Sequence, residues 1–190
     1  MPTWGGRRKG AGRKRQGRLR RVSHKTRPQH VQRFPLHVVL RARADAPPLR
    51  RGEIFSAVRH ALISALRADF RATHYSVQGN HIHLIVEAAD KLTLSRGMQG
   101  LAVRVARAVN RVAARHGRVF ADHYFARELR TPAEVRRAVR YVLDNFVLHA
   151  RVSPQADVCA GPLERPRTWL LSIGWRRSRA GPLPVAYWSG

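Results

Sequence analysis

The sequence predicts an α+β fold, a ferredoxin-like split βαβ antiparallel sheet with helices on one face. Two observations carry this prediction. The expected elements follow the order β-α-β-β-α-β-α within residues 34–150, and two of the strands are joined by only Gly79-Asn80, a tight hairpin turn that makes them antiparallel neighbours. We therefore expect a basic, disordered arm over residues 1–33, one domain over 34–150 and a C-terminal appendage over 151–190.

The first half of the domain alternates a strand, a helix and a hairpin. Residues 36–43 are rich in β-branched and apolar side chains, which predicts a strand. Apolar residues recur at helical spacing over 52–70, which predicts a one-sided amphipathic helix. Strands are expected over 73–78 and 81–87, on either side of the turn.

The second half repeats the pattern of helix, strand and helix. A continuous apolar stripe predicts a helix that begins at Thr93 or Ser95 and ends near His116, and a strand follows over 123–130. The last helix is expected from Pro132 to about Leu148. Its start has the capping-box residues Thr131 and Glu134.

The charge is extreme, since 37 Lys and Arg oppose 11 Asp and Glu and give a formal net charge of +26. Such a surface favours a polyanion, and nucleic acid is a better match than an anionic membrane. The arm is rich in Arg, Lys and Gly, and its residues 1–30 hold no acidic residue, which is typical of a disordered nucleic-acid-binding segment. The same arm could equally be a solvated tail that adds only nonspecific affinity.

Other functional classes find little support. Cys159 is the single cysteine, which excludes an intramolecular disulfide and a cysteine zinc cluster. No apolar run approaches the ~20 residues that span a bilayer, and the basic N-terminus lacks the apolar stretch of a signal peptide. We expect a cytoplasmic, nucleoid-associated protein without a membrane partner. The C-terminal appendage should hold at most one short element, with its Trp residues docked on the domain or stacked on bases.

A histidine pair suggests chemistry. His81 and His83 are two apart on an expected strand, so their side chains share one face while Ile82 points into the core. Neutral imidazoles are common ligands of divalent metal ions. Glu87 shares the histidine face and could support the site or cap the strand end.

A second pair lies on the last helix. Tyr141 and Asn145 are four residues apart and so neighbours on the flank of the apolar stripe. An Asn oxygen there could complete a metal site with the histidines, and the Tyr phenolate could attack a phosphate that the ion polarises. Tyr141 could instead be a half-buried core residue, and Asn145 a helix cap. Tyr124, on a strand without a ligand partner at helical spacing, is the weaker candidate nucleophile.

The segments Gln78-Gly79-Asn80-His81-Ile82-His83 and Arg140-Tyr141-Val142-Leu143-Asp144-Asn145 resemble the two motifs of the HUH single-tyrosine transposases, and most closely those of REP-associated tyrosine transposases with an IS200-like domain. The resemblance spans about residues 34–150. Phe146 departs from it, because the family commonly has Pro there, so the helix is expected to continue a little further.

This resemblance implies an HUH endonuclease core and cleavage and joining of single-stranded DNA through a covalent phosphotyrosine. It implies Tyr141 as the nucleophile, His81, His83 and Asn145 as ligands of Mg²⁺ or Mn²⁺, and hairpin DNA as substrate. Relatives include monomers and homodimers, so both remain open here. Two alternatives also remain: a catalytically inactive nucleic-acid-binding protein on the same fold, and, less well supported, a metal hydrolase that activates water.

Overall fold

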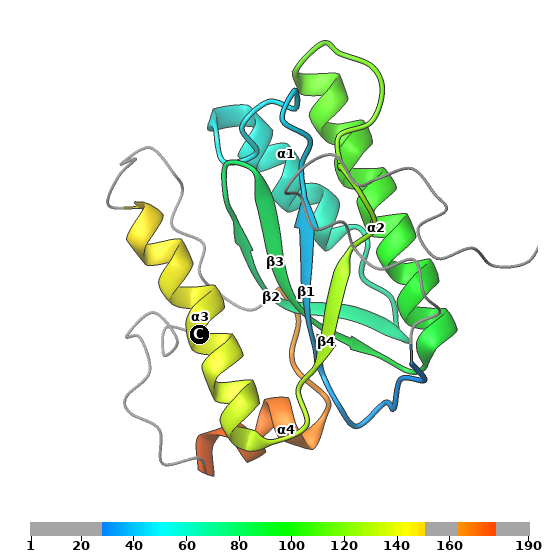
Figure 1. Ribbon diagram of the computed structural model, residues 1–190, viewed down its shortest axis with the longest axis vertical. Helices are drawn as coiled ribbons and strands as arrows, with labels where there is room; N and C mark the ends of the chain where they lie inside the picture. The colour runs from blue at the N-terminus through cyan, green and yellow to red at the C-terminus, as the bar shows by residue number, and fades with distance from the viewer. Residues whose placement is uncertain (1–27, 151–162, 178–190) are drawn as a thin grey trace, which may run out of the picture.

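The computed structural model describes residues 28–150 and 163–177 of the 190-residue chain, without the side chains of 146–150. Within them lies one four-stranded sheet in the spatial order β2-β3-β1-β4 (Figure 1). Its strands are β1 (Leu36–Arg41), β2 (Phe70–Val77), β3 (His81–Ala88) and β4 (Phe125–Glu128). Most of the expected basic arm, and residues 151–162 and 178–190 of the expected appendage, lie outside the described residues.

Every strand pair in the sheet is antiparallel. β3 pairs with β2 on one side and β1 on the other, and β4 forms the far edge against β1. The β2–β3 turn is as short as predicted, because the Gln78 N–H donates to the His81 carbonyl at 2.8 Å. The antiparallel, ferredoxin-like sheet of the sequence prediction is confirmed.

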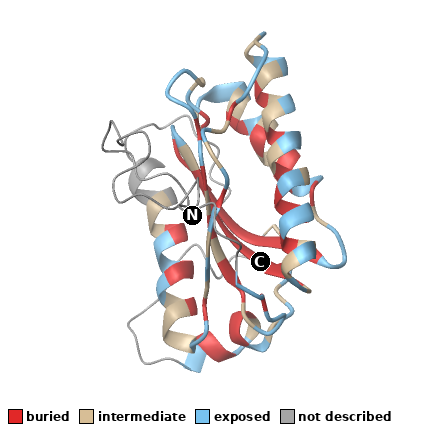
Figure 2. Cartoon of the chain, turned by 45° about the vertical axis from the view of Figure 1, so that its right-hand side comes forward, coloured by how far each residue is buried: buried red, intermediate tan, exposed pale blue. Residues whose placement is uncertain are grey.

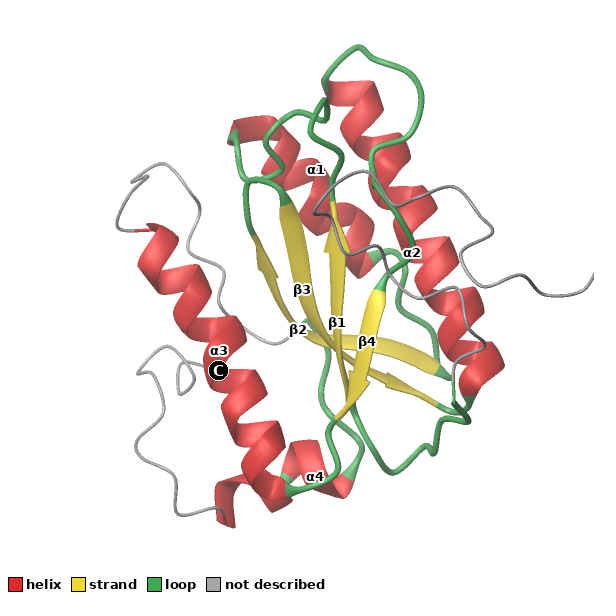
Figure 3. Cartoon of the chain, in the orientation of Figure 1, coloured by secondary structure: helices red, strands yellow, loops and turns green. Residues whose placement is uncertain are grey.

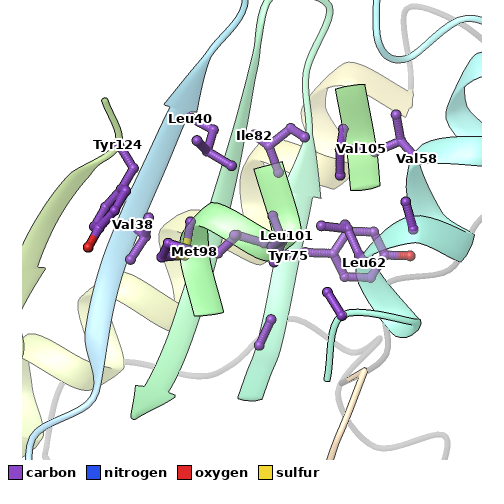
Figure 4. Close-up of a cluster of buried hydrophobic side chains, with 14 of the residues drawn as sticks. Val38, Leu40, Val58, Leu62, Tyr75, Ile82, Met98, Leu101, Val105 and Tyr124 are labelled. Atoms are coloured by element: carbon purple, nitrogen blue, oxygen red, sulfur yellow. The ribbon is translucent and has the colours of Figure 1, made fainter. Parts of the chain in front are cut away.

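Two helices cover the first face of the sheet. α1 (Gly52–Ile63) and α2 (Lys91–Val112) pack against each other and against the strands (Figure 3). The core beneath them is almost entirely apolar, with Met98 and Leu101 of α2 in the same buried cluster as Ile82 of β3 (Figure 4). At the start of α2, Asp90 accepts a hydrogen bond from the Thr93 N–H at 2.7 Å. This N-cap places the helix start slightly earlier than the sequence predicted.

The third helix corrects the expectation that the helices share one face. α3 (Pro132–Ala150) lies on the opposite side of the sheet from α1 and α2 (Figure 1). The reason is the alternation along β3: Ile82 and Leu84 belong to the first core, whereas Ile85 belongs to a second core with α3. The predicted capping box is present, since Glu134 N–H donates to Thr131 Oγ1 at 3.2 Å and Thr131 N–H to Glu134 at 3.1 Å.

The predicted helix over 52–70 is too long. α1 ends at Ile63, and Phe70 is instead the fully buried first residue of β2. Phe70 satisfies the apolar spacing of the helix, but its ring lies beside Gly97 of α2, where only a residue without a side chain leaves room for it. Tertiary packing therefore decides the conformation here.

Two short elements follow in the C-terminal part. α4 (Trp169–Ser172) and the 3₁₀ helix η1 (Gly174–Arg177) pack against α3, one element more than the sequence suggested. Trp175 is fully buried and its Nε1 donates to the Leu171 carbonyl at 2.7 Å, whereas Trp169 is half exposed. Docking on the domain is thus the role of Trp175.

Burial is one-sided along the longer helices, with the sheet-facing side buried and the outer side exposed (Figure 2). The outer side of α2 carries four exposed arginines and no acidic residue: Arg96, Arg104, Arg107 and Arg111. Among the described helices, none is long and apolar enough to cross a membrane.

Candidate active site

His81 and His83 lie side by side on the face of β3 that α3 covers. Their Nε2 atoms approach to 2.9 Å, and their ring centroids are 4.6 Å apart. His83 is buried and His81, next to the turn, is half-buried. The structure therefore brings together the histidine pair that the strand alternation predicted, with two ring nitrogens converging on one point.

A third histidine joins them from β1. The ring of His37 stacks on that of His83 with centroids 5.3 Å apart, and its Nε2 lies 3.2 Å from His83 Nδ1. His37 belongs to none of the motifs recognised in the sequence. The signal was weak: alternation in β1 turns His37 away from the first core, but only the pairing of Val39 with His83 shows that the two rings are diagonal neighbours.

Tyr141 of α3 lies over the two stacked imidazoles. Its ring meets that of His83 edge to face at a centroid distance of 5.1 Å, and that of His37 at 6.0 Å. Although it contacts the sheet, Tyr141 is 49% exposed. It is therefore neither a core residue nor a remote surface residue, but is held at the edge of the helix next to the histidines.

Asn145 lies one helical turn further along α3. Its backbone carbonyl accepts a hydrogen bond from Gln78 Nε2 at 3.3 Å, and Gln78 also donates to Ser76 Oγ at 2.7 Å. The side-chain Nδ2 of Asn145 is buried without a hydrogen-bond partner. Among the described contacts, none joins this amide to His81 or His83, so the structure places it near the hairpin end of the site with its side chain uncommitted.

Burial keeps the imidazoles neutral. It lowers the pKa of His83 to about 4, with repulsion from His81 and His37 acting in the same direction. Burial also lowers the pKa of His37, and the charge of Arg127 adds to the effect. Since a neutral imidazole keeps a lone pair for a metal ion, His83 can bind one at physiological pH without first losing a proton.

The other candidates have different roles. Tyr124 is buried in the first core, on the far side of the sheet from the histidines. Glu87 forms a buried ion pair with Arg71 and accepts hydrogen bonds from the backbone N–H groups of Arg167 and Thr168. It therefore fixes the C-terminal segment to the sheet and does not reach the histidines. These bonds hold the pKa of Glu87 below its usual range although burial opposes them.

Two arginines at the end of β1 differ in whether they form an ion pair. Arg41 pairs across from His81 in the β1–β3 register and is exposed, so it lies on the face of the candidate site. Arg43 is engaged instead with Asp45, at 2.8 Å from Nε to Oδ1.

Comparison with known protein families identifies the family of this chain. Residues 30–145, more than half of the chain, match the family described as Transposase IS200 like. The chain belongs to this transposase family. Its match ends at Asn145, so it includes β1, the histidine strand and Tyr141. No curated protein sequence matches the transposase significantly.

Solved structures resemble the transposase as well. The structure of a REP-associated tyrosine transposase bound to a REP hairpin aligns with a TM-score of 0.52 and 17% identity, covering 67% of this chain and 74% of that one. A crystal structure of a transposase-like protein from Deinococcus radiodurans aligns with a TM-score of 0.43 and 10% identity, over 66% of this chain and 98% of that one. At such identity, the first likeness concerns the fold alone.

The family resemblance implies a divalent ion, and the residues of the transposase fit one. Two nitrogens each about 2.1 Å from an ion and at right angles to each other are about 3.0 Å apart, and the Nε2 atoms of His81 and His83 are separated by 2.9 Å. Asn145, one turn from Tyr141, carries the amide oxygen that the resemblance implies as a ligand, and its Nδ2 is buried without a hydrogen-bond partner. Among the described residues, no three His, Cys, Asp or Glu side chains form a metal cluster.

Proposed function

We propose that this transposase is a metal-dependent single-stranded DNA endonuclease and strand transferase. Tyr141 is the nucleophile, and His81, His83 and Asn145 hold Mg²⁺ or Mn²⁺. The observation that carries the proposal is the contact between Tyr141 and His83, whose rings are 5.1 Å apart while Tyr141 stays half exposed. A nucleophile is thereby held beside the metal-ligating groups and remains open to a large substrate.

The chemistry is a phosphoryl transfer. The phenolic oxygen of Tyr141 attacks the scissile phosphorus, and the bond between phosphorus and the 3′ oxygen breaks. The 3′ oxygen takes up a proton and leaves as a hydroxyl, while the 5′ phosphate stays on Tyr141. A bound divalent ion would polarise the phosphate and offset its developing charge. Because the phosphotyrosine bond conserves the cleaved linkage, a second 3′ hydroxyl can reverse the step and rejoin strands.

Hairpin or repeat DNA is the proposed substrate. The similar solved structure is that of a transposase bound to a REP hairpin, and a net charge of +26 suits a phosphate backbone. Exposed Arg41 is placed to meet a strand that reaches the histidines. Tyr141 and His83 belong to the same chain, which supports a site built in cis, and a monomer or a homodimer can hold such a site.

The test is a search for the covalent adduct. Single-stranded hairpin oligonucleotides labelled at the 3′ end, which stays with the 5′-phosphotyrosine fragment, are incubated with the protein and Mn²⁺ and then run on a denaturing protein gel. We expect a labelled protein band that disappears with a chelator and with Tyr141→Phe. Tyr124→Phe is the matched control, because Tyr124 is the rival tyrosine on the other face, and it should keep the band.

Each alternative has its own outcome. A band that survives Tyr141→Phe contradicts the assignment of the nucleophile. Cleavage without any protein-linked product indicates a hydrolase, in which a water attacks in place of Tyr141. Salt-dependent binding without cleavage on any hairpin supports the catalytically inactive nucleic-acid-binding protein.

A further inference from the structure

In each of the two histidines of the proposed metal site, Nδ1 has a partner at hydrogen-bond distance. His81 Nδ1 lies 2.6 Å from Asn80 Oδ1, and His83 Nδ1 lies 3.2 Å from His37 Nε2. The outer nitrogens, both Nε2, face each other at 2.9 Å. Each histidine of the pair thus has a partner at Nδ1, and the two Nε2 atoms lie close together.

This arrangement determines where the protons sit on His81. A neutral imidazole carries one N–H and one lone pair, and an amide oxygen only accepts hydrogen bonds. Asn80 Oδ1 therefore requires the proton of His81 on Nδ1, which leaves the lone pair on Nε2.

For His83 the partner is another imidazole, that of His37, and the hydrogen bond between the two rings can run in either direction. If His37 donates, the proton of His83 sits on Nε2 and blocks an ion. If His83 Nδ1–H donates to His37 Nε2, the lone pair of His83 Nε2 faces that of His81. Two lone pairs at 2.9 Å repel each other unless a cation lies between them, so the second direction belongs to the metal-bound state.

Both partners are themselves held in place. His37 stacks on His83 with an interplanar angle of 19°, and it is half-buried. The backbone carbonyl of Asn80 accepts from the Ala42 N–H at 2.8 Å, which ties the hairpin turn to the end of β1. Neither partner has to be recruited when an ion arrives, because the sheet already positions both.

We propose that His37 and Asn80 are positioning residues, which orient His83 and His81 and fix the tautomers in which both Nε2 atoms bind the ion. This inference rests on the proposed function, since it concerns the same metal site. Hydrogen-bond partners behind metal-bound imidazoles commonly contribute 10- to 100-fold to metal affinity. The two residues act through the histidines and contact neither metal nor DNA in this role.

Metal affinity is the first measurement. Mn²⁺ binding to the full-length protein is followed by electron paramagnetic resonance, without DNA and without turnover. We expect His37→Leu and Asn80→Ala each to weaken Mn²⁺ binding by about 10-fold or more. His37→Gln and Asn80→Asp keep an oxygen acceptor and should restore most of the affinity. His60→Leu, on α1 across the sheet, should bind Mn²⁺ like the wild type.

The tautomers are the second measurement. Long-range ¹H–¹⁵N spectra of ¹⁵N-histidine-labelled protein with saturating Mg²⁺ should place the protons of His81 and His83 on Nδ1. A purely structural role of His37 predicts no rescue of Mn²⁺ affinity by His37→Gln.

Opposite results overturn the inference in distinguishable ways. Unchanged Mn²⁺ affinity in both His37→Leu and Asn80→Ala overturns the positioning roles and leaves the metal site standing. A His83 proton on Nε2 with Mg²⁺ bound shows that His83 does not bind the ion through Nε2, and it overturns the metal site as proposed together with the positioning roles. Wild-type protein that takes up no Mn²⁺ overturns the metal site and the positioning roles together.

Discussion

The two faces of the sheet are built on opposite principles. Under α1 and α2, the core of the first face consists of apolar side chains and two tyrosines, Tyr75 and Tyr124, and the buried His30 lies at its β4 edge, hydrogen-bonded to Glu128. The second face, under α3 and the C-terminal segment, carries buried polar or charged side chains from β2, β3 and their turn: Arg71, His74, Ser76, Gln78, His83 and Glu87. The first face supplies most of the apolar core, and the second face presents polar and charged side chains from the same strands.

The covering of the two faces differs as well. α1 and α2, which cover the first face, are helices that lie between the strands in the sequence, whereas the second core depends on Leu170, Leu171 and Trp175, which come after residue 162. Glu87 fastens that distant segment by accepting from Thr168 N–H and Thr168 Oγ1, both at 2.7 Å. The face that carries the histidines is thus covered in part by a segment distant in the sequence, while its own strands place polar side chains there.

The largest effect should come from emptying the second core. Trp175→Ala removes a fully buried ring and should lower the free energy of unfolding by about 3–5 kcal/mol. Urea unfolding measures this loss, and amide exchange should rise more in α3 than in α2. Trp169→Ala is the control: with Trp169 52% exposed, its loss should be below about 1 kcal/mol. Equal losses in the two variants would mean that the second core does not depend on Trp175.

Overpacking the first core should rank next. A methyl group on Gly97 would overlap the ring of Phe70, which is fully buried and has no room to move away. We expect Gly97→Ala to destabilise by about 2–3 kcal/mol in urea unfolding. Gly100→Ala, on the same helix, meets only the flexible end of Arg104 and should be neutral or slightly stabilising. A neutral Gly97→Ala would show that the first face is not tightly packed.

Acid should weaken the second face selectively. Burial lowers the pKa of His74 to about 4 from the 6.5 of an unfolded chain, so the unfolded state binds more protons between those values. Stability is therefore fully present above pH 6.5 and is lost as the pH falls toward 4. From pH 7 to 5 the loss should be about 2 kcal/mol. His83, with its pKa also about 4, acts in the same direction.

Urea unfolding at pH 7, 6 and 5 measures this dependence. His74→Leu should remove the part of the pH dependence of the unfolding free energy that His74 contributes, whatever its effect on stability at pH 7. A wild-type curve that is flat between pH 7 and 5 would contradict the burial of a neutral His74.

The smallest effect is expected on the outer side of α3. Arg140 Nε lies 3.3 Å from Asp144 Oδ2, an exposed pair one helical turn apart. Such pairs contribute little, and Asp144→Asn should change the free energy of unfolding by less than about 0.5 kcal/mol. Thermal unfolding in low and high salt provides the check. A larger loss would mean that this flank also supports the second core.

Local patterns predicted much of this molecule. Period-two alternation placed His81 and His83 on one face, and Thr131 with Glu134 marked the start of α3. These features depend on neighbours within four residues, where backbone geometry leaves few choices. The helical spacing of Tyr141 and Asn145 likewise put them on one flank of α3.

What escaped prediction depends on long-range contacts. Phe70 fits a helical stripe and belongs to β2 because of its packing beside Gly97. His37 joins His83 only through the register of two strands that are far apart in the sequence. That α3 crosses to the second face, and that Glu87 holds residues 167 and 168, likewise follow from tertiary structure. None of these contacts can be predicted from a short stretch of sequence.

The late position of Trp175 links assembly to the order of synthesis. A nascent chain that has emerged only to residue 150 contains the whole sheet, its first core and Tyr141, but not the segment that covers α3. The helix that bears Tyr141 can then settle against His83 only after about 25 further residues have left the ribosome, at roughly a second or more of elongation. The proposed nuclease is therefore completed last, on a scaffold that folds first. Limited proteolysis of released chains that end at residue 150 and at residue 190 should find α3 susceptible in the first and protected in the second.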